Sequence, residues 1–211
     1  MNKNVLVFGI SESEKPKYLN KLSDAIDITI ITNDFISQNQ TNDETVYTGM
    51  LLLDDKREIN TYDFIYNNPN HFSQIQSYLK SILNKNRPVL AIGQGMYFLN
   101  DLFHRNDKQI YDQINVSDDL LDIFISPGSK TAAIIGSGGF FKIPNSLPLS
   151  MKDFQRSNDL ITSVYELGTG YVHGIESTLH DWVLGYQFNP FVDGPSIVRA
   201  VIDGFIERAL E

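Results

Sequence analysis

The chain has 211 residues, of which 42% are apolar, and 26 acidic against 17 basic residues give a formal net charge of −9. This length predicts a single domain over residues 1–211, and the acidic balance argues against nucleic-acid binding, which needs clustered Lys and Arg. The chain has no cysteine, which excludes disulfides, thiolate metal sites and thiol catalysis. No apolar stretch reaches the roughly 18 residues that span a bilayer, and the N-terminal apolar run is too short for a secretory signal. We therefore expect a cytoplasmic protein that binds no membrane.

The first half of the chain alternates short apolar segments with amphipathic ones. The pattern predicts strands at 4–9, 27–32, 44–55, 62–70 and 88–92, and helices at 14–25, 71–85 and 94–104. The segment 62–70 enters a turn marked by Asn-Asn-Pro-Asn. This alternation is typical of a parallel sheet with crossover helices.

The second half has closely spaced apolar segments and few helical intervals. Strands are predicted at 120–126, 131–136, 140–144, 159–167, 171–177 and 182–188. They suggest antiparallel additions to the sheet. A last helix is predicted after Pro195, because Pro is tolerated in a first helical turn.

The stretch RPVLAIGQGMYFLND, residues 87–101, reads as a buried strand, a tight turn and a helix. Such a turn presents one side chain above the sheet edge, next to helix N–H groups that can stabilise negative charge. The turn here is Gly93-Gln94-Gly95, which offers no nucleophile.

Several segments together resemble class I glutamine amidotransferases. PVLAIGQGMYFLN is similar to that family's nucleophile elbow, typically PvLGICxGmQ, and GMYFLN resembles the GMQLLN of the gamma-glutamyl hydrolase branch, peptidase family C26. YDFIYNNPN resembles the strand and oxyanion loop, YVHGIES the Asp-Gly-hydrophobic-Glu strand, and VLGYQFNPF the GVQFHPE motif. The resemblance implies an α/β three-layer sandwich of flavodoxin-like type, with a mostly parallel central sheet and antiparallel additions.

The residues that perform the family's chemistry do not carry over. Gly93 stands at the position of the catalytic Cys, Asn189 at that of the His and Phe191 at that of the Glu. Gly93 has no side-chain atom to attack a carbonyl, Asn189 cannot take a proton near neutral pH, and Phe191 cannot orient an imidazole. Asn68 and Asn70 replace the small residues usual in the oxyanion loop. Glycine also accepts strained dihedrals at low cost, so we expect Gly93 to relax the elbow.

The resemblance without its catalytic residues predicts a catalytically degenerate protein with no cofactor. Its role would be to bind a small polar ligand or a protein partner, including a second copy in a homodimer. Ligand-binding residues would be Asn68, Asn70, Gln94, Tyr97 and Gln187, although Tyr97 packing in the core and glutamines satisfying backbone groups are equally consistent with the sequence. Two alternatives stay open: an amidotransferase or gamma-glutamyl hydrolase-type enzyme that uses non-standard residues, and a non-catalytic subunit that docks to a synthetase.

Other polar clusters favour simpler interpretations. His173, Glu176, His180 and Asp181 suggest a metal site, but residues 173 and 176 of one strand point to opposite faces, so no metal site is predicted. The segment GSGG, 136–139, lacks the Lys-Ser/Thr ending of a phosphate loop and is predicted to be a turn between strands. Ser137 has no evident base partner and is not expected to act as a nucleophile.

Overall fold

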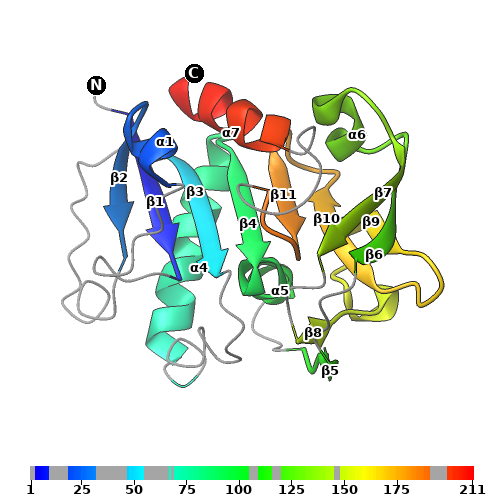
Figure 1. The fold of residues 1–211 in the computed structure, drawn as a ribbon. Coiled ribbons are helices and arrows are strands. Elements are labelled where there is room, and N and C mark those ends of the chain that lie inside the picture. Colours follow the sequence, from blue (N-terminus) through cyan, green and yellow to red (C-terminus); the bar gives the residue numbers. More distant parts are fainter. Residues whose placement is uncertain are drawn as a thin grey trace.

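The computed structural model describes residues 3–9, 19–31, 47–54, 67, 69–104, 109–115, 120–144, 148–190 and 199–211. These residues form a sheet of nine strands in the order β2-β1-β3-β4-β11-β10-β9-β6-β7, together with a small two-stranded sheet, β5-β8 (Figure 1). The nine strands are β1 (Asn4–Phe8), β2 (Asp27–Ile30), β3 (Tyr47–Asp54), β4 (Val89–Gly93), β6 (Leu120–Ile125), β7 (Gly139–Pro144), β9 (Leu160–Glu166), β10 (Val172–Ser177) and β11 (Val183–Tyr186).

The sheet has a parallel part and an antiparallel part. Strands β2, β1, β3, β4 and β11 pair in parallel, so their carboxyl ends meet at one edge, at the bottom of Figure 1. Strands β10, β9, β6 and β7 extend the sheet beyond β11 through antiparallel pairs. The predicted parallel sheet with antiparallel additions is confirmed.

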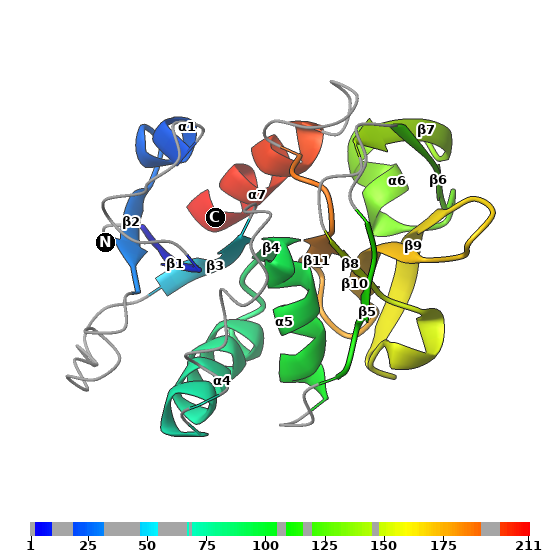
Figure 2. The same ribbon diagram turned by 60° about the horizontal axis from the view of Figure 1, so that its bottom comes forward.

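Helices cover both faces of the sheet, which makes three layers (Figure 2). Helices α4 (Pro69–Asn84) and α5 (Gln94–Phe103) cover one face, and α1 (Leu19–Ser23), α6 (Lys130–Ile135) and α7 (Ala200–Leu210) the other. Ile75, Leu79 and Ile82 recur at helical spacing on α4 and are buried against the first face. Strand β4 is buried at every residue because both faces are covered.

The segment 131–136, predicted as a strand, is helix α6. The Ser129 hydroxyl caps this helix by accepting a hydrogen bond from the Ala132 backbone N–H at 3.0 Å, and Gly136 ends it in a left-handed conformation with φ 79°. The turn at 136–139 therefore joins a helix to β7, not two strands. The prediction was wrong because a segment of six residues, four of them apolar, is too short to reveal a helical period.

Other predictions differ in their bounds or fall outside the described residues. Helix α4 begins at Pro69, within the expected Asn-Asn-Pro-Asn turn, because Pro suits the first turn of a helix. Most of the strand and turn predicted over 62–70 lies outside the described residues, as do the start of the last helix at Pro195, Asn68 and Phe191. Within the described residues, no helix is long and apolar enough to cross a membrane.

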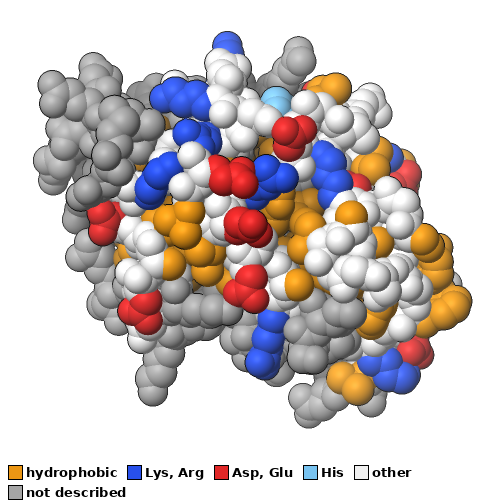
Figure 3. Space-filling model, turned by 90° about the horizontal axis from the view of Figure 1, so that it is seen from above, with side chains coloured by type: hydrophobic (Ala, Val, Ile, Leu, Met, Phe, Trp, Pro, Cys, Tyr) orange, Lys and Arg blue, Asp and Glu red, His pale blue; other side chains and the backbone are white. Residues whose placement is uncertain are grey.

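The small sheet lies next to the carboxyl edge of the parallel strands. Strands β5 (Asp112–Gln113) and β8 (Leu149–Ser150) pair antiparallel, and a 3-10 helix, Asp153–Gln155, follows. Figure 3 shows the opposite end of the molecule, where the described Lys and Arg side chains are mixed with Asp and Glu. The described residues of that face therefore do not form a surface of one charge sign.

Candidate functional site

The candidate site is the sharp turn from β4 into α5 at Gly93. Gly93 has φ 65° and ψ −131°, and it precedes the helix without a side-chain cap. A positive φ of this kind is strained for residues with a side chain. Gly93 pairs in register with Asp54 of β3, and on the other side of β4 Ile92 pairs with Tyr186 of β11. The backbone thus makes a strand-to-helix elbow at the edge where the parallel strands end.

Gly95 lets the elbow pack closely on the neighbouring strand. A Cβ atom added at Gly95 would lie 2.3 Å from the Leu52 carbonyl oxygen of β3. No side chain fits at that distance, so the turn needs glycine at this position. Helix α5 is consequently pressed onto the sheet, and all of its residues from Gln94 to Leu102 are buried.

Asn189 lies at the same edge of the sheet as Gly93. It follows β11, which runs parallel to β4 in direct register, and its side chain is only 3% exposed. Phe191, the third position of the expected trio, lies outside the described residues. Gly93 has no side chain that could act as a nucleophile, and Asn189 has no group that could act as a base near neutral pH. Residue 93 therefore cannot form a thioester.

Tyr97 and Gln187 meet at one backbone carbonyl. The Tyr97 hydroxyl donates to the Leu149 oxygen at 2.8 Å, and Gln187 Nε2 donates to the same oxygen at 3.3 Å. Burial raises the pKa of Tyr97 far above its ordinary value, and a hydrogen bond with Gln187 offsets only part of this. The Tyr97 side chain therefore stays neutral, and its hydroxyl links α5 to β8 by a hydrogen bond.

Two polar atoms near the elbow have no hydrogen-bond partner among the described residues. They are Gln187 Oε1 and His173 Nδ1, on side chains that are 1% and 2% exposed. The two residues are adjacent across the strands, since the Gln187 N–H donates to the His173 carbonyl at 3.0 Å. Buried acceptors in proteins are normally paired, so Gln187 Oε1 is a free acceptor for a group with an N–H or O–H.

The remaining predicted residues lie at different depths. Gln94, at the start of α5, is 5% exposed, whereas Asn70 is exposed in the first turn of α4. Asn68 lies outside the described residues. The described part of the predicted ligand set therefore divides into a buried group, Gln94, Tyr97 and Gln187, and one surface residue, Asn70.

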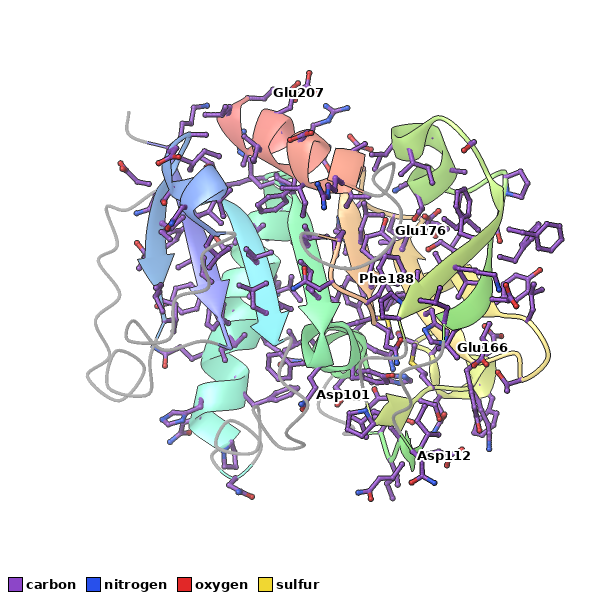
Figure 4. The ribbon with its side chains drawn as sticks, viewed as in Figure 1. Asp101, Asp112, Glu166, Glu176, Phe188 and Glu207 are labelled. Carbon is purple, nitrogen blue, oxygen red and sulfur yellow. The ribbon has the colours of Figure 1, made fainter. Side chains whose placement is uncertain are left out.

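A polar network behind α5 was not expected from the sequence. Asn100 Nδ2 donates to the Gln155 carbonyl at 2.8 Å, and Asn100 Oδ1 accepts from the Ser157 N–H at 2.8 Å. The Tyr111 hydroxyl donates to Asp101 Oδ1 at 2.6 Å; Asp101, which is labelled in Figure 4, belongs to α5. These bonds attach the segments 109–115 and 148–157 to α5 and give the elbow a rigid base. The polar pair Asn100-Asp101 within an apolar helix was the available signal.

Glu176 also has a structural role. Its carboxylate is 2% exposed and accepts hydrogen bonds from the backbone N–H groups of Lys130, at 2.9 Å, and Thr131, at 3.2 Å. It lies beside α6 (Figure 4). His173 faces Glu166 instead, with Nε2 3.6 Å from Glu166 Oε2. Among the described residues, no three His, Asp or Glu side chains could hold one metal ion.

Comparisons with solved structures find the same fold in glutamine amidotransferase domains. The structure matches a protein from Thermoplasma acidophilum that is described as a putative GMP synthase subunit, with a TM-score of 0.66 and 15% identity over 100% of this chain and 95% of that one. It matches the glutaminase domain of Trypanosoma brucei CTPS, solved with bound acivicin, with a TM-score of 0.67 and 11% identity over 98% and 93% of the two chains. It also matches PurLQS from Thermotoga maritima, with a TM-score of 0.58 and 11% identity over 98% and 99%.

These similarities establish the flavodoxin-like class I glutamine amidotransferase fold. No family model and no curated protein sequence matches the chain. At such low identities the shared fold does not transfer an activity, so function has to be argued from the residues at the elbow.

Proposed function

We propose that this protein is a catalytically degenerate member of the class I glutamine amidotransferase-like group, with kinship to the gamma-glutamyl hydrolase branch. It would bind a small polar ligand or a protein partner and would not cleave glutamine through a thioester. The supporting observation is Gly93, which has the backbone of a nucleophile elbow, φ 65° and ψ −131°, and no side chain. Asn189, at the same edge, adds no base.

The buried polar groups beside the elbow support a binding role. Gln187 Oε1 has no partner among the described residues, so a ligand N–H or O–H placed there would gain a desolvated hydrogen bond. Gln94 and Tyr97 belong to the first turns of α5, next to Gly93, while Asn70 is exposed in the first turn of α4. Clefts at the carboxyl ends of parallel strands are frequent binding sites in folds of this kind.

A turnover assay tests the loss of catalysis. Purified protein would be incubated with glutamine and, separately, with a gamma-glutamyl anilide, and release of ammonia or of the aniline would be followed. We expect rates equal to those of a buffer blank. A rate well above the blank that disappears in the Gln187→Leu variant would instead show an enzyme that works with non-standard residues.

A binding assay tests the ligand role. Glutamine, glutamate and asparagine would serve as probes, and their affinities would be measured by calorimetry. We expect at least one probe to bind and Gln187→Leu to weaken it about tenfold, the effect of losing one buried hydrogen bond. Gln113→Leu, on the exposed side of β5, is the matched control and should bind like the wild type. Equal affinity in both variants would contradict a role for Gln187.

A second candidate function is that of a subunit docked to a synthetase-like protein. Ile110 and Phe154 are 88% and 79% exposed near the small sheet, and Gln155 Nε2 donates to the Ile110 carbonyl, which holds the two segments together. Exposed large apolar side chains that cluster favour a protein contact. Two of the structurally similar proteins, PurLQS and the GMP synthase subunit, carry names that are consistent with such a partner.

Recovery of partners from the native host separates these possibilities. Tagged wild-type protein should retain a partner that the double variant Ile110→Asp/Phe154→Asp loses. The control Phe140→Asp changes a residue of similar exposure, 73%, on the edge strand β7, and should retain the partner. If the wild type recovers only itself and sediments as a dimer, the partner is a second copy.

A further inference from the structure

A cavity lies away from the elbow, between α4 and the carboxyl end of α5. Its volume is about 510 Å³, and it is lined by Gln76, Leu79, Lys80, Leu83, Asn84, Leu102, Phe103, Asp159 and His180. Cavities that hold small molecules span roughly 300–1,000 Å³. Phe103 ends a helix of ten residues that starts at the elbow, so the cavity is separated from Gly93 by the helix length of about 15 Å.

The walls of this cavity are fixed by hydrogen bonds between separate segments. Gln76 Nε2 donates to the Leu102 carbonyl at 3.3 Å and so joins α4 to α5. The Ser157 hydroxyl donates to the Phe103 carbonyl at 3.3 Å, which attaches the loop before Asp159. The ring of His180 contacts the ring of Phe103, with centroids 6.5 Å apart. The cavity is thus a preformed feature of the fold.

The cavity is lined by buried apolar side chains and by side chains of both charge signs. Leu79 and Leu102 are each 4% exposed. Lys80 is exposed on α4 and Asp159 is half-buried in the loop, and neither side chain forms an ion pair with another described residue. A cation and an anion around one apolar cavity complement a ligand that carries both charges on an apolar body.

We propose that this cavity binds an α-amino acid with a large apolar side chain. The ligand carboxylate would face Lys80, the ammonium would face Asp159, and the side chain would lie on Leu79, Leu83 and Phe103. A phosphorylated ligand fits less well, because a single lysine faces it and the Asp159 carboxylate would repel it. This site is independent of the elbow and does not depend on the function proposed for it.

Calorimetric titration with L-phenylalanine and L-leucine tests the assignment. Two analogues, 3-phenylpropionate and phenethylamine, each lack one of the two charges of phenylalanine. We expect saturable binding of the amino acids and at least about fivefold weaker binding of each analogue, the effect of one partly exposed ion pair. Failure of both amino acids to bind, or analogues that bind as tightly as phenylalanine, would overturn the proposal.

Paired variants locate the binding on the molecule. Lys80→Ala should weaken phenylalanine binding about fivefold, while Lys85→Ala, which removes an exposed lysine outside the cavity, should leave it unchanged. Leu83→Trp, at a half-buried position of the lining, should abolish binding by filling the cavity. An equal loss in Lys80→Ala and Lys85→Ala, or full binding by Leu83→Trp, would place the ligand elsewhere and refute the assignment.

Discussion

The amino ends of helices α6 and α5 differ in how side chains cap their backbone N–H groups. At α6 the Ser129 hydroxyl accepts from Ala132, and the Glu176 carboxylate accepts from Lys130 and Thr131. At α5 the capping position is Gly93, with no side-chain cap. A helix amino end attracts negative groups, and at α6 the Glu176 carboxylate supplies one. This difference indicates that the amino end of α6 has a structural role.

The polar side chains around the two helix ends also differ in whether they are hydrogen-bonded. Beside α6, the Thr131 and Tyr186 hydroxyls are 2.8 Å apart, and burial raises the pKa of Tyr186 well above its ordinary value. Beside α5, Gln187 Oε1 has no partner within the described segments. A fully hydrogen-bonded polar cluster rigidifies a fold, whereas a buried acceptor without a partner is costly unless a bound group donates to it. This contrast indicates a structural role for the α6 end and is consistent with the binding role proposed for the α5 end.

The largest expected effect comes from removing the carboxylate at α6. Glu176→Ala would remove the acceptor of the Lys130 and Thr131 N–H groups and should lower the free energy of unfolding by about 3 kcal/mol, measured by urea denaturation. Glu176→Gln keeps one acceptor oxygen and should cost less. Glu207→Ala, which removes an exposed glutamate on α7, should stay within about 0.5 kcal/mol of the wild type. A loss at Glu176 no larger than at Glu207 would contradict the structural role.

A smaller effect is expected at the α5 end, from the backbone alone. Gly93→Ala places a Cβ at φ 65° and should lower the melting temperature, with a cost of about 2 kcal/mol. Gly128→Ala is the matched control, since an added Cβ there meets nothing within 4 Å; it should be neutral or stabilise by up to about 1 kcal/mol. A melting temperature that rises in Gly93→Ala would show that glycine does not relax the elbow.

The same contrast explains which features could be predicted from the sequence. The turn at Gly93 was predictable because its signals are local: an apolar strand, two glycines, and Met96, Leu99 and Phe103 at helical spacing. Helix α6 was missed, although Ser129 and Gly136 are cap residues at its two ends, because the six-residue segment TAAIIG is too short to show a helical period.

The partners of the site residues could not be predicted because they are distant in sequence. Tyr97 bonds to a carbonyl 52 residues away, and Glu176 accepts from Lys130 across 46 residues. No local pattern specifies which backbone group a buried side chain will meet. Tyr97 was therefore equally consistent with packing and with ligand binding, and only the fold shows that its hydroxyl is held by Leu149.

The smallest effect tests the contact of His173 with Glu166 through its pH dependence. The His173 ring, with Nε2 3.6 Å from Glu166 Oε2, lowers the pKa of Glu166 below its ordinary value of 4.5, although burial opposes this. A carboxyl with a lower pKa in the folded state stabilises the fold above pH 4.5, and this stability is lost as the pH falls through the folded-state pKa. Between pH 5.5 and pH 3, the wild type should therefore lose about 1 kcal/mol more than Glu166→Gln. Glu207→Gln removes an exposed carboxyl and should follow the wild type. Parallel stability curves for Glu166→Gln and the wild type would contradict this role. They would mean that the contact of His173 with Glu166 does not stabilise this end of β10. The polar groups near the elbow would then be less ordered than their burial indicates.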